Sequence, residues 1–165
     1  MNPSQLRLIV DSNVLIDLHW GGVLKEFFAL PYGFFSPDII IDELGHPDGE
    51  ELLSKGLQCY EMDKEGVQEV SSWAEQYPNI ASSDLFALVG AKKEGYFLLT
   101  GDKCLRKLAE ENGITVHGTI WVLDEMVRIG TLKPVEAACA LRSMVKNGSR
   151  LPTQECEERL RRWEK

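Results

Sequence analysis

The stretch LRLIVDSNVLIDL, residues 6–18, places a strand-like run directly before a helical one, and it decides the fold class. Residues 6–10 are an apolar, β-type run of the kind found in a parallel strand that is covered on both faces. After Asp11, the residues Val14, Leu15 and Leu18 recur at the spacing of one helix face. This order predicts the first half of a βαβ unit.

The rest of the chain repeats this alternation of strands and helices. Alternating elements predict βαβ units and therefore a parallel sheet with helices on both faces, an α/β fold. Ser36 and Pro37 have the residue types of a helix N-cap and first helical position. We expect strands at 6–10, 34–35, 57–62, 96–100 and 114–117, and helices at 13–18, 23–30, 37–44, 48–55, 64–76, 82–94, 103–112, 119–129, 135–146 and 153–163.

Length and charge describe one acidic domain with an uneven charge distribution. The 165 residues fit a single domain, and the formal net charge is −8. Residues 1–83 carry −10 and residues 84–165 carry +2, so one face can be basic although the whole chain is acidic. The net charge alone disfavours a nucleic-acid partner, because affinity for phosphates comes largely from Lys and Arg.

Cysteine usage and hydropathy predict a cytoplasmic location. No two cysteines form a C-x-x-C pair, so a structural zinc site is improbable and the thiols should be reduced and mostly buried. The start, residues 1–11, lacks the long apolar core of a secretory signal. The longest uncharged stretch, 27–37, is too short and too interrupted to span a bilayer. The cysteines are Cys59, Cys104, Cys139 and Cys156.

Four acidic residues fall where a parallel sheet would gather ligands, near the carboxyl ends of its strands. Asp11 follows the first strand, Glu43 ends the helix after the second, Asp84 opens the helix before the fourth, and Asp102 follows the fourth. Each aspartate also has a structural interpretation: Asp11 as a strand-end cap, Asp84 as an anion in a first helical turn, and Asp102 as a helix N-cap. Glu43 does not, because a carboxylate at a helix C-terminus is unfavourable by about 0.3–1 kcal/mol.

Carboxylates that converge in one pocket repel each other, and a hard divalent cation with oxygen ligands relieves that repulsion. Such a cation also lets an acidic pocket accept a phosphodiester and braces an attack on phosphorus. The pattern therefore indicates a Mg²⁺ or Mn²⁺ site.

The chain resembles the PIN-domain family at four motifs in the family's order, IVDSNVLID (9–17), PDIIIDEL (37–44), SSDLFAL (82–88) and LLTGDK (98–103). The resemblance covers about residues 6–130 and assigns Asp11, Glu43, Asp84 and Asp102 to the family's acidic positions. It implies that Asn13 and Thr100 support the acids or contact phosphate.

The resemblance also implies a three-layer αβα sandwich and Mg²⁺- or Mn²⁺-dependent cleavage of RNA. It suggests the toxin of a toxin–antitoxin pair, with an antitoxin partner and a homodimeric state. We interpret residues 1–130 as a PIN-like domain and residues 131–165 as a C-terminal helical appendix of the same domain. The further acids Asp17, Asp42 and Asp124 are alternatives to the chosen four, and Asp42 rivals Glu43 directly.

Two other function classes remain open. A phosphate-accepting switch of the receiver type would use Asp11, Asp63, Thr100 and Lys133, although the paired acids expected after its first strand are missing here. A non-catalytic module that binds nucleic acid or protein would keep the acids in a degenerate site.

Overall fold

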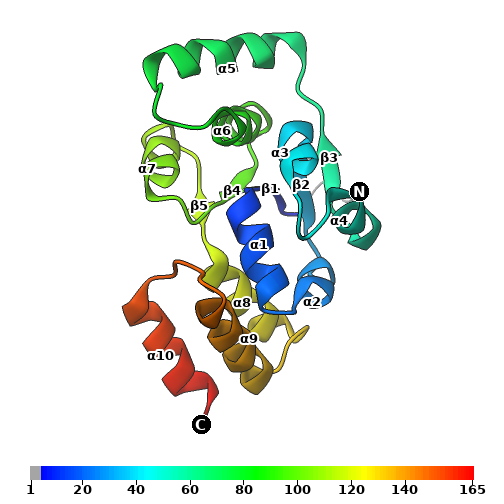
Figure 1. Ribbon diagram of the computed structural model, residues 1–165, viewed down its shortest axis with the longest axis vertical. Coiled ribbons are helices and arrows are strands. Elements are labelled where there is room, and N and C mark those ends of the chain that lie inside the picture. Colours follow the sequence, from blue (N-terminus) through cyan, green and yellow to red (C-terminus); the bar gives the residue numbers. More distant parts are fainter. Residues whose placement is uncertain (1–4) are drawn as a thin grey trace.

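A five-stranded, entirely parallel sheet forms the centre of the protein (Figure 1). The computed structural model describes residues 5–165. The spatial order is β3-β2-β1-β4-β5, so the first strand lies in the middle and the chain crosses over it. The strands are β1 (Arg7–Val10), β2 (Gly33–Pro37), β3 (Gln58–Tyr60), β4 (Phe97–Leu99) and β5 (Val116–His117).

One face of the sheet is covered by α3, α5, α6 and α7, with α5 lying outside α6 (Figure 1). Helix α6 packs on β1 and β2, and its residues Leu85, Leu88 and Val89 are buried in the apolar cluster on this face. It ends at Gly95, whose positive φ of 73° suits a left-handed helix terminus. The bounds are α3 (Asp38–Glu43), α5 (Lys64–Gln76), α6 (Ser82–Glu94) and α7 (Lys103–Glu111).

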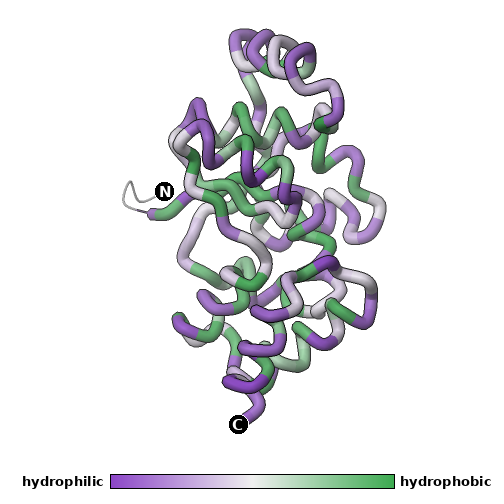
Figure 2. The backbone as a smooth tube through the Cα atoms, turned by 90° about the vertical axis from the view of Figure 1, so that its left-hand side faces the viewer, coloured by the Kyte–Doolittle hydropathy of each residue, from purple (hydrophilic) through white to green (hydrophobic). Residues whose placement is uncertain are grey.

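The other face is covered by α1, α2 and α8, and α4 lies beside α2 and α3. Figure 2 shows the apolar backbone segments concentrated between these layers. The architecture is therefore the predicted three-layer αβα sandwich. The bounds are α1 (Ser12–Trp20), α2 (Leu24–Phe28), α4 (Gly49–Lys55) and α8 (Thr119–Ile129).

The two C-terminal helices, α9 (Pro134–Lys146) and α10 (Thr153–Trp163), extend the second layer. Helix α9 packs on α1 and α8, and α10 packs on α9. Leu141 and Met144 of α9 and Trp163 of α10 belong to the same apolar cluster as β1 and α1. The helices beyond residue 130 thus share the core of the domain.

Several expectations need correction. Ser36 does not cap α3: it lies in β2, and its buried hydroxyl donates to the Val10 carbonyl at 2.7 Å, while Pro37 stands at the N-cap position. The thiols are not mostly buried, because only Cys156 is; the exposed ones are Cys59, Cys104 and Cys139.

Among residues 5–165, none of the helices is both long and apolar enough to cross a membrane. The segment expected to lack a secretory signal is residues 1–11, and its first four residues lie outside the described residues.

Candidate functional site

The carboxyl ends of two neighbouring central strands bring Asp11 and Asp102 to one rim of the sheet. Asp11 directly follows β1, and its backbone N–H donates to the Leu99 carbonyl of β4 at 2.9 Å. Asp102 lies three residues beyond the end of β4 and caps α7. Asp84 reaches the same rim from the first turn of α6, the helix that packs on β1. We call these three aspartates the acid group.

Asp11 is buried and held on both carboxylate oxygens. Its Oδ1 accepts from the Ser12 backbone N–H at 2.8 Å, and its Oδ2 accepts from the Thr100 hydroxyl at 2.8 Å. Burial raises the pKa of Asp11 above its ordinary value although both hydrogen bonds act to lower it. The residue is a strand-end cap, as its structural interpretation predicted, and it also adjoins the other two acids.

The loop after β4 is fixed by the two small polar residues that the sequence singled out. The Asp102 backbone N–H donates to the Thr100 hydroxyl oxygen at 3.1 Å, and the Gly101 N–H donates to the Asn13 side-chain oxygen at 3.1 Å. Asp102 caps α7, because its Oδ1 accepts from the Leu105 N–H at 2.8 Å. Thr100 and Asn13 therefore connect β1 and α1 to the Asp102 loop.

Asp84 carries the strongest electrostatic signature of the acid group. Partial burial, repulsion by Asp11 and Asp102, and a hydrogen bond shared with Asp11 raise its pKa from 3.8 to about 7. Glu43 contributes further repulsion, so the other three predicted acids all act on this one carboxyl group. Near neutral pH the acids therefore do not all ionise readily, and a bound proton or a bound cation would relieve their repulsion.

The structure separates Glu43 from its rival Asp42, although both are exposed. Glu43 raises the pKa of Asp84, which places it on the side of the acid group. Asp42 instead raises the pKa of Cys59 in β3, behind the larger effect of that thiol's burial. Glu43 is the last residue of α3, where the helix dipole disfavours a carboxylate. The last turn of α3 contains no basic residue that would offset this unfavourable interaction.

The other acids have structural partners away from the acid group. Asp17 is buried and accepts from the hydroxyls of Thr119 at 2.8 Å and Ser149 at 2.6 Å, which ties α1 to α8 and to the loop before α10. Burial raises the pKa of Asp17 despite these two bonds.

Asp124 accepts from Arg159 at 2.8 Å, and Asp63 caps α5 by accepting from the Gly66 N–H at 2.7 Å. Asp63, which a receiver-type switch would phosphorylate, also forms an ion pair with Lys93.

The donor set fits a hard divalent cation in its chemistry. Asp11, Asp84 and Asp102 offer only oxygen ligands, and their mutual repulsion is what a 2+ charge would relieve. Within residues 5–165, however, no three His, Cys, Asp or Glu side chains are already arranged as a metal-binding set. Both oxygens of Asp11 and Oδ1 of Asp102 are instead engaged in hydrogen bonds.

Two supporting groups were not anticipated from the sequence. The Ser12 backbone N–H donates a hydrogen bond to the Asp11 carboxylate. The Ser36 hydroxyl donates to the carbonyl of Val10, the residue that precedes Asp11. The serine that follows a strand-end aspartate is a detectable signal, because aspartate side chains commonly accept from nearby backbone N–H groups. Ser36 gave no such signal, since its partner is 26 residues away.

The comparisons with known proteins agree with this architecture. A family model described as PIN domain (DUF3368) matches residues 7–165. Solved structures that match include a PilT N-terminus domain protein from the hyperthermophilic archaeon Sulfolobus solfataricus, at 15% identity and a TM-score of 0.54, covering 74% of this chain and 94% of that one. At that identity the likeness concerns the fold alone. No curated protein sequence matches. The chain belongs to the PIN-domain family, whose fold is generally that of a nuclease.

Proposed function

We propose that this protein is a Mg²⁺- or Mn²⁺-dependent endoribonuclease that hydrolyses RNA phosphodiester bonds. The observation that carries the proposal is the meeting of Asp11, Asp84 and Asp102 at one rim, where partial burial and the repulsion of the other two acids raise the pKa of Asp84 to about 7. Such repulsion is more characteristic of a cation site than of two helix caps and one acid of a first helical turn, because none of these structural roles needs a second carboxylate beside it.

Each residue of the site has a distinct task in this proposal. Asp11, Asp84 and Asp102 would hold the cation, with Glu43 at the edge of the set. A bound Mg²⁺ or Mn²⁺ supplies charge neutralisation for the phosphodiester and a lowered pKa for an attacking water. Thr100 keeps Asp11 and the Asp102 loop in register, since its hydroxyl contacts both residues.

The Asn13 side-chain oxygen accepts a hydrogen bond from the Gly101 N–H and so fixes the path of the backbone into α7. We assign Asn13 and Thr100 to support of the acid group rather than to phosphate contact.

We further propose that the protein is the toxin of a toxin–antitoxin pair, active in the cytoplasm as a homodimer and inhibited by an antitoxin. The support is the likeness of its four motifs to those of small PIN-domain toxins. A small DNA-binding protein encoded beside this chain would favour that role, whereas its absence would leave a nuclease without a dedicated inhibitor.

Cleavage of a mixed RNA pool in Mg²⁺ or Mn²⁺ tests the nuclease proposal. We expect the wild type to cleave, and Asp11→Asn and Asp102→Asn to abolish cleavage. Asp42→Asn is the matched control, because it removes the same charge from an exposed neighbour of Glu43 that acts on Cys59 instead.

Activity that survives both site changes, or no activity with either metal, would contradict the proposal. In that event, labelling of Asp63 by acetyl phosphate would identify a switch, and RNA binding without cleavage would identify a binding module.

A further inference from the structure

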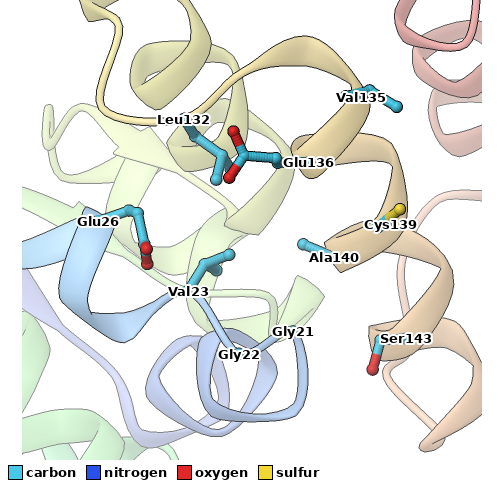
Figure 3. A pocket seen from close by; sticks show the side chains of 10 residues that line it. All are labelled: Gly21, Gly22, Val23, Glu26, Leu132, Val135, Glu136, Cys139, Ala140 and Ser143. Carbon is cyan, nitrogen blue, oxygen red and sulfur yellow. The ribbon is translucent and has the colours of Figure 1, made fainter.

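A cavity lies at the opposite end of α1 from the acid group. Asp11 caps the start of α1, whereas the turn at Gly21 and Gly22 ends it and forms one wall of a cavity of about 420 Å³ (Figure 3). Helix α9 forms the facing wall. The two walls pack so closely at their base that a Cβ on Gly21 would lie 2.6 Å from the Met144 terminal carbon. The cavity is therefore separate from the proposed nuclease site.

The backbone of the α1 turn offers this cavity no free hydrogen-bond donor. The N–H groups of Gly21, Gly22 and Val23 all donate to carbonyls of α1, at 2.9, 3.0 and 3.1 Å. A glycine-rich turn binds phosphate through free backbone N–H groups, so this one is unsuited to an anion.

The polar side chains of the cavity are acceptors. Glu26 and Glu136 extend their carboxylates from opposite walls toward the space between them (Figure 3). The Ser143 hydroxyl already donates to the Trp20 carbonyl at 2.7 Å, which leaves only its acceptor capacity. The lining contains no Lys, Arg or His. The cavity thus has two negative charges and no cation of its own.

One of these acceptors lacks any partner. The Oε2 atom of Glu26 is closed off from solvent and unpaired, one of two such side-chain atoms within residues 5–165, whereas the Glu26 residue as a whole is half-buried. A buried carboxylate oxygen without a donor is costly and calls for an explanation such as an unseen partner. Glu136 differs, since its Oε1 accepts from the Lys133 N–H at 3.3 Å in the capping box of α9.

We propose that this cavity binds an alkylguanidinium or alkylammonium group, with the cationic head between Glu26 and Glu136. The head supplies the donors that the lining lacks, and Val23, Leu132 and Ala140 provide apolar surface for the alkyl stem. The volume lies within the range of small-ligand sites. The cation is either a free amine or the side chain of an Arg or Lys in a partner protein.

Chemical-shift perturbation of the Gly21 and Gly22 amides tests this proposal. The probes are butylguanidinium, its uncharged isostere butylurea, and N-acetyl-arginine methylamide as a mimic of a protein side chain. We expect saturable shifts with butylguanidinium at millimolar concentrations and none with butylurea. Equal binding by the arginine derivative would identify a protein side chain as a possible source, and its failure beside butylguanidinium would identify a free small molecule.

Glu26→Gln keeps the shape of the side chain and is expected to weaken binding by at least about tenfold, because it removes a charge-assisted partner. The matched control is Glu75→Gln, which makes the same change at an exposed position of α5. Shifts that butylurea reproduces, that persist in Glu26→Gln, or that appear with none of the probes would each overturn the proposal. Nuclease activity plays no part in this test.

Discussion

Asp84→Asn should stabilise the metal-free protein at alkaline pH, against the usual effect of altering a partly buried residue. The pKa of Asp84 is raised to about 7 in the folded protein from an ordinary 3.8. The folded state therefore holds a proton that the unfolded state releases. The resulting stability is fully present below about pH 4 and is lost as the pH rises through 7.

The magnitude follows from this difference in pKa. A change from 3.8 to about 7 corresponds to about 4 kcal/mol at full effect. The carboxyl group is only half-buried, so solvent screening reduces the figure to about 1–2 kcal/mol. Asparagine also loses a favourable interaction with the α6 dipole, worth about 0.3–1 kcal/mol. The net gain for Asp84→Asn at pH 8 is therefore about 1 kcal/mol.

Urea unfolding in EDTA at pH 5 and pH 8 measures this effect. About three-fifths of the total loss falls between these two pH values, so the wild type should lose about 1 kcal/mol more than Asp84→Asn between them. Asp42→Asn is the control, and it should keep the pH dependence of the wild type because Asp42 does not act on Asp84. An unchanged pH dependence in Asp84→Asn would refute the conclusion that burial and the neighbouring acids raise the pKa of Asp84.

Three further outcomes are expected. Asp17→Ala removes the shared acceptor of the Thr119 and Ser149 hydroxyls, so the free energy of unfolding in urea should fall by about 2–3 kcal/mol. A change near zero would show that water replaces the carboxylate. Thr100→Val should lower the free energy of unfolding by about 1–2 kcal/mol, because it removes the hydroxyl that donates to Asp11. The pKa of Asp11 should rise further, since this hydrogen bond lowers it in the wild type, and carboxyl-carbon NMR would measure the rise. An unchanged titration of Asp11 would contradict this role of Thr100. A thiol reagent should modify the exposed cysteines rapidly and the buried one slowly, and four equal rates would contradict the packing of α10. The exposed set is Cys59, Cys104 and Cys139.

The helices were predictable where glycine marks their ends. Residues 82–94 and 119–129 agree with α6 and α8 because Gly95 and Gly130 adopt positive φ values of 73° and 96° there. The edge strands were overestimated: 57–62 contracts to Gln58–Tyr60 and 114–117 to Val116–His117. Each edge strand pairs with one neighbour only, so its apolar pattern continues beyond its ladder.

The chain order of the acids was sufficient to predict that Asp11, Asp84 and Asp102 approach each other, because parallel strands share one carboxyl rim. The choice between Asp42 and Glu43 was not predictable, since the rotational phase of the six-residue α3 does not follow from its sequence. The exposure of three thiols was mispredicted because general burial tendencies do not specify which face of a helix or of an edge strand points outward: Cys59 lies in β3, Cys104 in α7 and Cys139 in α9.

The central claim is that one divalent cation binds among the acid group, and the most direct test is a crystal structure grown in Mn²⁺ with anomalous diffraction data. The account predicts an anomalous peak within about 2.0–2.3 Å of carboxylate oxygens of Asp11, Asp84 and Asp102. Density without such a peak, in which the three carboxylates keep the hydrogen bonds described above, would contradict it.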